Sequence, residues 1–426
     1  MLLIKNTFLI DPKTHRQERT DILVCDGKIA AIGNAAAFKE MTDASQLQIY
    51  DGEGLVAAPG LIDVHVHFRD PGFTYKEDIL SGSRAAAAGG FTTVVLMANT
   101  NPVVDNQETL SYVLEKGKET DIHVKSCCSI TKGMRGEELT DISYLLQQGA
   151  AGFTDDGKPL LDEALTYQAM QEAARLGTVL SFHEENPAYI KDNGINAGEA
   201  SAYYGIGGSS REAEISMVRR DVRLAAETGA AINIQHISTK EAVMLVREAK
   251  KAGHAIHAEA TPHHISLTQE AAIRCGTLAK MNPPLREELD RAAIIEGLKD
   301  GTIDLIATDH APHSREEKEK PITQAPSGII GLETALPLCI TNLVKPGHLT
   351  LMQLLEKLTR NPAKLYGLDA GYLAVGGPAD IVLFDADAEN HIEGFLSKSW
   401  NSPFWGEKLT GKVRCTICGG RIVYQK

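Results

Sequence analysis

The chain has 426 residues, 43% hydrophobic and 23% charged, which is ordinary for a globular protein with a domain of roughly 250 residues or more and a smaller one. Its formal net charge of −13 argues against nucleic acid or an anionic membrane as a partner. No signal-peptide pattern is evident and no apolar run approaches about 18 residues, so we expect no membrane span.

Seven cysteines are scattered along the chain, an odd number that suits free thiols in a reducing compartment, so we expect a cytoplasmic protein. Cys415 and Cys418 form a lone C-x-x-C pair near the end of the chain. Because no second pair accompanies them, we interpret both as strand-packing residues.

Both ends of the chain share a β-rich pattern, in which short alternating hydrophobic runs are separated by Asp, Gly and Pro. Examples are LLIKNTFLI at 2–10 and ADIVLFDADAE at 379–389. Neither end is long enough to make a stable sheet alone. We therefore predict one small β-sandwich domain, built from residues 1–55 and 367–426 together.

Residues 56–366 alternate hydrophobic β-rich runs with amphipathic helical stretches, the pattern of βα units around a parallel sheet. The predicted strands lie at 60–68, 91–99, 121–130, 151–157, 178–185, 230–238, 254–264 and 302–312. Predicted helices at 75–90, 161–177, 211–229 and 239–253 each end at glycine, as helices often do. Eight βα units predict a (β/α)8 TIM-like barrel, an α/β fold whose active site lies at the carboxyl ends of its strands.

The first predicted strand carries His65 and His67, followed by Arg69. Residues two apart on a strand face the same side, so these three side chains should project together. Two half-buried histidines on a sheet face are one interpretation. A metal pair is the other, because neutral imidazole is a common ligand for zinc and similar ions. The choice depends on whether the rest of the chain supplies further ligands.

Candidate ligands follow four other predicted strands. Asp155 and Asp156 end the fourth strand, His183 the fifth, His236 the sixth and Asp309 the eighth. Each residue alone could mark a turn or cap a strand. Together with the first strand, they place four histidines and two carboxylates around one barrel opening, which predicts a hydrolytic centre with one or two divalent metal ions.

The order H-x-H, His, His, Asp on strands one, five, six and eight resembles the amidohydrolase superfamily. Seven motifs together make the chain similar to the bacterial type I dihydroorotase family within it: DVHVHFRDPG, MANTNP, FTDDG, QHIST, KMNPPLR, ATDHAPH and PSGIIGLE. The resemblance covers the whole chain, including the divided β domain. It implies a metal-dependent hydrolase of a cyclic amide.

The resemblance implies Zn²⁺ as the cofactor, one or two ions with two favoured. His65 and His67 would bind one ion beside Asp309, and His183 and His236 would bind the second. Many relatives place a carboxylated lysine of strand four between the ions, whereas this strand offers aspartate.

Two aspartates compete for that bridging position. Asp156 lies 27 residues before His183, the spacing expected of the aspartate ligand in this family, and is our choice. Asp155 is then expected to serve the turn, and Lys158, in the following loop, is expected to be solvated.

The resemblance also implies a substrate site. The implied substrate-binding residues are His67, Arg69, Asn99, Asn282, His313, Ser327 and Gly328. Arg69, Asn99 and His313 would hold a substrate carboxylate, which a guanidinium can bind through two hydrogen bonds. The competing interpretation of Arg69 is an ion pair with Asp70 or Asp63.

The implied reaction is the reversible hydrolysis of (S)-dihydroorotate to N-carbamoyl-L-aspartate, whose ring-closing direction serves pyrimidine and UMP synthesis. A metal-activated water would attack the ring carbonyl, with Asp309 as general acid and base. One alternative is another cyclic amidohydrolase, such as hydantoinase, dihydropyrimidinase or allantoinase, which usually carries the bridging lysine. A second is a non-catalytic dihydroorotase-like subunit that supports aspartate transcarbamoylase, but such subunits lose metal ligands. A homodimer and association with aspartate transcarbamoylase are left open.

The resemblance gives no role to the five histidines of the seventh and eighth predicted strands. His310 is adjacent to Asp309 and should face away from the site, so we expect it to be structural. Four others crowd the seventh predicted strand: His254, His257, His263 and His264. We expect these to pack or to support the ligands.

Overall fold

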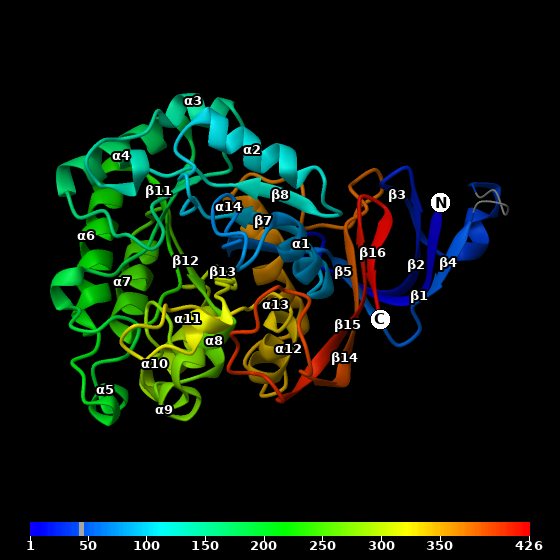
Figure 1. The fold of residues 1–426 in the computed structure, drawn as a ribbon. Helices are drawn as coiled ribbons and strands as arrows, with labels where there is room; N and C mark the ends of the chain where they lie inside the picture. Colours follow the sequence, from blue (N-terminus) through cyan, green and yellow to red (C-terminus); the bar gives the residue numbers. More distant parts are fainter. Residues whose placement is uncertain (42–46) are drawn as a thin grey trace.

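The computed structural model describes residues 1–41 and 47–426. Figure 1 shows two parts: a barrel surrounded by helices, and beside it a β-sheet that contains both the N-terminus and the C-terminus. This arrangement confirms the predicted barrel with a β domain formed by both chain ends.

All eight predicted barrel strands are present. They are β6 (Leu61–Val66), β7 (Phe91–Leu96), β8 (His123–Ser126), β9 (Phe153–Thr154), β10 (Val179–Phe182), β11 (Ala231–Ile234), β12 (Ile256–Ala260) and β13 (Leu305–Ile306). Strands β6 to β8 form one parallel sheet and β9 to β13 another. Parallel bridges from Cys128 to Phe153 and from Val66 to His310 join the two sheets into a closed barrel.

Helices cover the outside of these strands or occupy the connections between them. They are α1 (Ile79–Ala88), α2 (Gln107–Gly117), α3 (Ile142–Gln147), α4 (Glu163–Leu176), α5 (Glu199–Tyr204), α6 (Glu212–Thr228), α7 (Lys240–Lys251), α8 (Pro262–Ser266), α9 (Glu270–Cys275), α10 (Glu288–Asp300), α11 (Arg315–Lys318), α12 (Ala335–Cys339), α13 (Leu351–Leu358) and α14 (Arg360–Leu365). Short 3-10 turns are η1 (Ala35–Met41), η2 (Lys132–Met134), η3 (Pro187–Tyr189) and η4 (Gly276–Ala279), and η5 (Ile340–Val344) is a π-helical turn.

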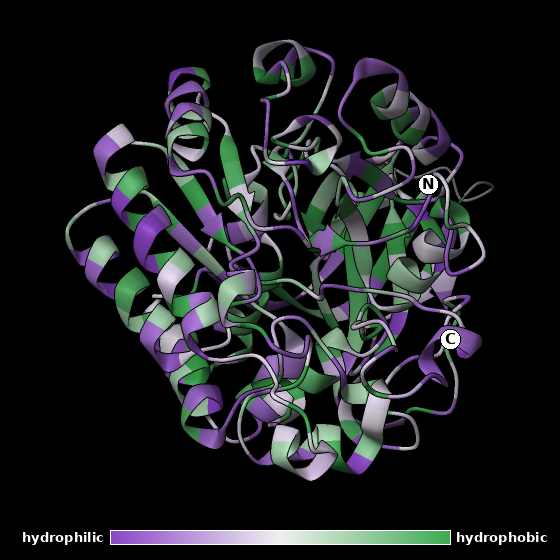
Figure 2. Ribbon diagram, turned by 60° about the vertical axis from the view of Figure 1, so that its left-hand side comes forward, coloured by the Kyte–Doolittle hydropathy of each residue, from purple (hydrophilic) through white to green (hydrophobic). Residues whose placement is uncertain are grey.

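Local sequence explains where the main helices begin and end. Asp162 and Thr239 cap the first turns of α4 and α7 with their side-chain oxygens, and Gly177 and Gly229 end α4 and α6 in the left-handed conformation. Figure 2 shows barrel strands that are largely hydrophobic, surrounded by helices that alternate hydrophobic and hydrophilic residues. This pattern packs one face of each helix on the barrel. No helix within the described residues is long and apolar enough to span a bilayer.

The seventh predicted strand is shorter than expected. The sequence predicted a strand region through residue 264, but β12 ends at Ala260 and the last residues form α8. Thr261 caps this helix through the backbone N–H of His264, and Pro262 occupies its first turn, where proline is well tolerated.

The terminal β domain is one sheet of eight strands. These are β1 (Leu2–Asp11), β2 (Arg16–Cys25), β3 (Lys28–Gly33), β4 (Gln48–Asp51), β5 (Val56–Pro59), β14 (Ile381–His391), β15 (Lys408–Cys418) and β16 (Arg421–Gln425). Strand β5 lies between β1 and β14 and so joins the N-terminal strands to the C-terminal ones. The N-terminal and C-terminal strands therefore form one continuous sheet rather than one sheet at each end of the chain. Its core combines residues from both ends, such as Ile4, Ile22, Ile381 and Ile417.

Candidate metal centre

The structure brings the six predicted ligand residues together at the carboxyl ends of the barrel strands. His65 belongs to β6, and the others follow the ends of β6, β9, β10, β11 and β13: His67, Asp156, His183, His236 and Asp309. All six are buried. Five of them line a pocket of about 170 Å³, and the sixth, His65, lies within 3.5 Å of two lining residues, Asp156 and Asp309.

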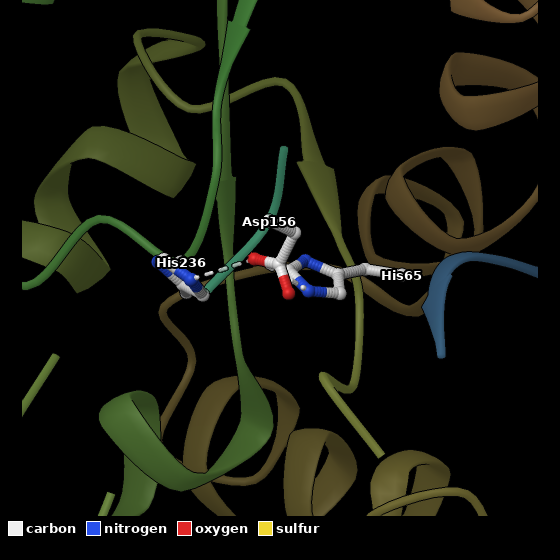
Figure 3. A group of neighbouring side chains, drawn as sticks. All are labelled: His65, Asp156 and His236. Carbon is white, nitrogen blue, oxygen red and sulfur yellow. Dashed lines mark ion pairs between the residues drawn. The ribbon is translucent and has the colours of Figure 1, made fainter. Parts of the chain in front are cut away.

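Asp156 lies at the centre of this cluster. Its Oδ1 atom is 3.3 Å from His65 Nε2, 3.5 Å from His183 Nδ1 and 3.5 Å from His236 Nε2. Its Oδ2 atom is 3.3 Å from His67 Nε2. Figure 3 shows the Asp156 carboxylate between the imidazoles of His65 and His236. One carboxylate thus faces both histidine pairs, as a bridging ligand must.

Asp309 lies beside the first histidine pair. Its Oδ1 atom is 3.0 Å from His67 Nε2 and 3.5 Å from His65 Nε2. Burial opposes ionisation, but the His65 and His67 imidazoles together lower the pKa of Asp309 to about 2. The same balance, with His65 as the main charged partner, holds the pKa of Asp156 well below its usual value. Both carboxylates are therefore ionised at neutral pH.

The neighbours of Asp156 point elsewhere. Asp155 accepts hydrogen bonds from the backbone N–H groups of Ile130 at 2.7 Å and Thr131 at 3.1 Å, and from the Thr131 hydroxyl. It therefore ties β9 to the preceding loop. Lys158 is exposed.

The donor set fits a metal. His65 Nε2 and Asp156 Oδ1 are buried and have no hydrogen-bond partner among the described residues, although each lies within 3.5 Å of other cluster atoms. Two groups within this cluster are compact enough to hold an ion: His65 with Asp156 and His236, and His65 with His67 and Asp309. Imidazole and carboxylate donors of this kind suit zinc and similar divalent ions.

Two supporting carboxylates were missed in the sequence. Glu259 in β12 is fully buried, and its Oε1 atom is 2.5 Å from His65 Nδ1. Glu185 Oε2 is 3.1 Å from His183 Nε2. Burial lowers the pKa of His183, but Asp156 and Glu185 together raise it to about 10. The sequence did contain a signal for both, because each glutamate lies within a predicted hydrophobic strand. A carboxylate buried in such a strand needs a buried partner, and a nearby histidine can be that partner.

Arg69 points into the same pocket. Its Nε donates to the Pro312 carbonyl at 3.2 Å, and its Nη2 is 3.5 Å from His313 Nε2. Neither acidic neighbour in the sequence pairs with it. Asp70 binds Lys116 at 2.6 Å, and Asp63 accepts the backbone N–H of His65.

Strand alternation is not the reason that Arg69 faces the pocket. Strand β6 ends at Val66, and Arg69 has a φ of 59°. His236 and Asp309 also have positive φ values, of 32° and 48°. Such conformations are costly for residues with a side chain and are frequent at functional sites.

The remaining predicted substrate residues surround the pocket. Asn99 Oδ1 is 2.9 Å from His67 Nδ1, and His313 Nε2 is 2.8 Å from the Ser327 carbonyl oxygen. Asn282 Oδ1 and Ser327 Oγ are buried and have no hydrogen-bond partner within the described part of the chain. Gly328 has a φ of 153°, and a Cβ there would lie 2.6 Å from the Ala311 carbonyl oxygen.

The other histidines lie outside the pocket. His310 faces Phe68 and Glu77, away from the cluster. His263 and His264 are buried in α8, and His264 binds the Thr261 hydroxyl and the Pro283 carbonyl. His254 is exposed, and His257 pairs with Asp304.

A βα barrel with histidines and aspartates at its strand ends defines a hydrolase of the metal-dependent barrel class. The chain belongs to the amidohydrolase family, which it matches over residues 56–423. This membership confirms the resemblance predicted from the motifs.

Relatives of similar length share this family. The chain is 54% identical to a dihydroorotase of Clostridioides difficile, with 100% of both chains covered, and 52% identical to one of Lactococcus lactis, covering 100% of this chain and 99% of the relative. Among solved structures, an L-hydantoinase (dihydropyrimidinase) from Arthrobacter aurescens superposes with a TM-score of 0.86 at 29% identity, covering 100% of this chain and 96% of the other. A dihydropyrimidinase from Brevibacillus agri has the same fold, with a TM-score of 0.84 at 22% identity and coverage of 99% and 95%.

Proposed function

We propose that this protein is a dihydroorotase that catalyses the reversible hydrolysis of (S)-dihydroorotate to N-carbamoyl-L-aspartate. The observation that carries the proposal is Arg69, whose guanidinium points into a pocket with His67, Asp156 and Asp309 and is not paired with a carboxylate of the described residues. Such a group suits a substrate that brings its own carboxylate. Full-length relatives at 50–54% identity that are named dihydroorotases support the same conclusion.

Two zinc ions are the cofactor that we propose. His65, His67 and Asp309 would hold one ion, His183 and His236 the other, and Asp156 would bridge them. When bound, such ions polarise a carbonyl oxygen and lower the pKa of water toward neutrality.

Asp309 would move the proton. Despite its burial, His65 and His67 hold its pKa below the usual value, so Asp309 is an ionised carboxylate at neutral pH and has an oxygen that can accept a proton from the attacking water. It then delivers this proton to the ring nitrogen as the carbon–nitrogen bond breaks. Ring closure runs the same steps in reverse.

The other pocket residues would orient the substrate. Arg69, Asn99 and His313 would hold the substrate carboxylate. Asn282 and the Ser327–Gly328 backbone would contact the pyrimidine ring, and the unpartnered Asn282 Oδ1 offers an acceptor for a ring N–H. Burial and the nearby Arg69 charge lower the pKa of His313 to about 3, so His313 is neutral and has one ring N–H, which the Ser327 carbonyl oxygen accepts at 2.8 Å from Nε2.

The rival cyclic amidohydrolases fit this chain less well. Hydantoinases and dihydropyrimidinases share the fold. Their substrates lack the carboxylate for which Arg69 is suited, and here Asp156 lies where many of them have a lysine. A non-catalytic subunit that supports aspartate transcarbamoylase is disfavoured because every predicted ligand residue is retained.

The test is steady-state kinetics with four substrates: dihydroorotate, hydantoin, dihydrouracil and allantoin. We expect dihydroorotate to have the highest kcat/KM, by at least about tenfold. That factor corresponds to the free energy of one charge-assisted hydrogen bond, which the substrates without a carboxylate cannot form with Arg69. A higher kcat/KM for any of the other three would assign the protein to a rival activity.

Partners and location remain predictions. Sedimentation of the protein alone and mixed with aspartate transcarbamoylase would test for a homodimer and for their association. Cell fractionation would test the expected cytoplasmic location.

A further inference from the structure

The connection between β14 and β15, residues 392–407, leaves the terminal sheet and returns to the barrel. In Figure 1 it is the orange-red segment that runs from the sheet toward α8 and α12. Phe404 and Ile392 of this connection pack on Leu338 of α12. Its residues also bind loops near the barrel opening, since the Ser399 hydroxyl donates to the Lys76 carbonyl at 2.8 Å.

Asn401 of this connection is bound to the barrel loops through both its side chain and its backbone. Its side chain is fully buried, at 0% exposure. Its Nδ2 donates to the carbonyl oxygens of Ala311 and Gly328, both at 3.0 Å. Its Oδ1 accepts the backbone N–H of His313 at 3.0 Å, and its carbonyl oxygen accepts the N–H of Ile330 at 3.0 Å.

These four partners lie on two different loops. Ala311 and His313 follow β13, whereas Gly328 and Ile330 precede α12. His313 and Ser327 of these loops line the pocket, whereas Asn401 does not. Asn401 therefore contacts the backbone of the two loops whose side chains face the substrate, without lining the pocket itself.

We infer that Asn401 is a positioning residue, through which the terminal domain sets the spacing between His313 and the Ser327–Gly328 segment. The inference rests on the proposed function, because those groups are assigned there to the substrate carboxylate and ring. An alanine at 401 would leave one buried N–H and the Ala311 carbonyl without their side-chain partner, whereas the Gly328 carbonyl keeps the Lys318 ammonium at 3.1 Å. The two loops would then shift relative to each other.

The matched control is Thr416→Val. Thr416 is also fully buried, and its hydroxyl ties the terminal sheet to the barrel by donating to the Ala87 carbonyl at 2.7 Å. It does not line the pocket. If KM rises only because the protein is less stable or the two domains separate, it should rise in both Asn401 and Thr416 variants. If KM rises because the two pocket loops shift relative to each other, it should rise in the Asn401 variants alone.

The experiment compares KM, kcat, bound metal and melting temperature for wild type, Asn401→Ala, Asn401→Ser and Thr416→Val. We expect both Asn401 variants to raise KM for dihydroorotate about ten- to hundredfold, the cost of misplacing a binding group by about 1 Å, with a smaller change in kcat. Bound metal should be unchanged. Thr416→Val should lower the melting temperature but keep a wild-type KM.

A KM within twofold of wild type in a folded Asn401 variant, or an equal rise in Thr416→Val, would overturn the inference. If neither Asn401 variant folds, hydrogen exchange of the wild-type protein decides. Binding of N-carbamoyl-aspartate should then protect a peptide spanning 396–405 together with 311–330, and protection of 311–330 alone would contradict the role of Asn401. An inactive wild type that binds neither substrate nor product would instead refute the proposed function.

Discussion

Glu259 and His65 form a buried carboxylate–imidazole pair, with Glu259 Oε1 2.5 Å from His65 Nδ1 and both side chains at 0% exposure. Because Nδ1 is engaged, the Nε2 atom of His65 is the one directed at Asp156 and Asp309. Asn233 binds the second oxygen of Glu259 at 3.0 Å and fixes its orientation. Glu259 thus determines which nitrogen of His65 is available to a metal.

Replacing Glu259 with glutamine should weaken metal binding about ten- to hundredfold, the usual effect of losing the hydrogen-bond partner of a histidine ligand. The measurement is metal affinity by competition with a chelator. Asp221→Asn on α6 is the control, since Asp221 is an equally buried carboxylate that binds Arg220 instead. Equal affinity in wild type and Glu259→Gln would mean that His65 is not a ligand or does not need this partner.

The adjacent aspartates give a paired test of the bridging position. Asp156→Ala should lower both bound metal and turnover, because Asp156 faces both histidine pairs. Asp155→Ala should keep most of the metal and lose stability instead, because Asp155 binds the backbone of Ile130 and Thr131. Metal analysis and thermal melts distinguish the two, and the reverse pattern would exchange their roles.

Asp309→Asn separates proton transfer from metal binding. Asparagine keeps the shape and one oxygen donor but cannot accept a proton at neutral pH. We expect kcat to fall at least ~10²-fold, the scale of a general acid–base group, while most of the metal is retained. Near-normal turnover in a metal-loaded variant would assign the proton transfer to another group.

The sequence was sufficient to predict the eight strands and the convergence of six candidate ligand residues, because hydrophobic periodicity and strand-end position are local properties. It could not predict Glu259 as the partner of His65, since the two are 194 residues apart and meet only when the barrel closes. Asn401 was missed for the same reason, as its partners lie on two loops more than 70 residues away. The helix at Pro262 could have been predicted, because Thr-Pro is a common start for a helix.

Arg69→Met tests whether the pocket recognises a carboxylate. The variant loses the charge but keeps most of the hydrophobic stem, so loss of a hydrogen bond to a charged group should cost about 1.5–3 kcal/mol. That corresponds to a drop of roughly ten- to more than hundredfold in kcat/KM for dihydroorotate. Dihydrouracil, which has the same ring without the carboxylate, serves as the comparison substrate and should be affected much less. Equal losses for both substrates would make Arg69 structural.

The central claim is that the buried histidines and aspartates at the strand ends form a metal centre that hydrolyses dihydroorotate. The most direct measurement is turnover of dihydroorotate by protein whose metal content is determined in the same sample, before chelation, after chelation and after zinc is restored. We predict activity that disappears with the metal and returns in proportion to bound zinc, levelling off near two ions per chain. Full turnover of dihydroorotate by demonstrably metal-free protein would contradict the claim.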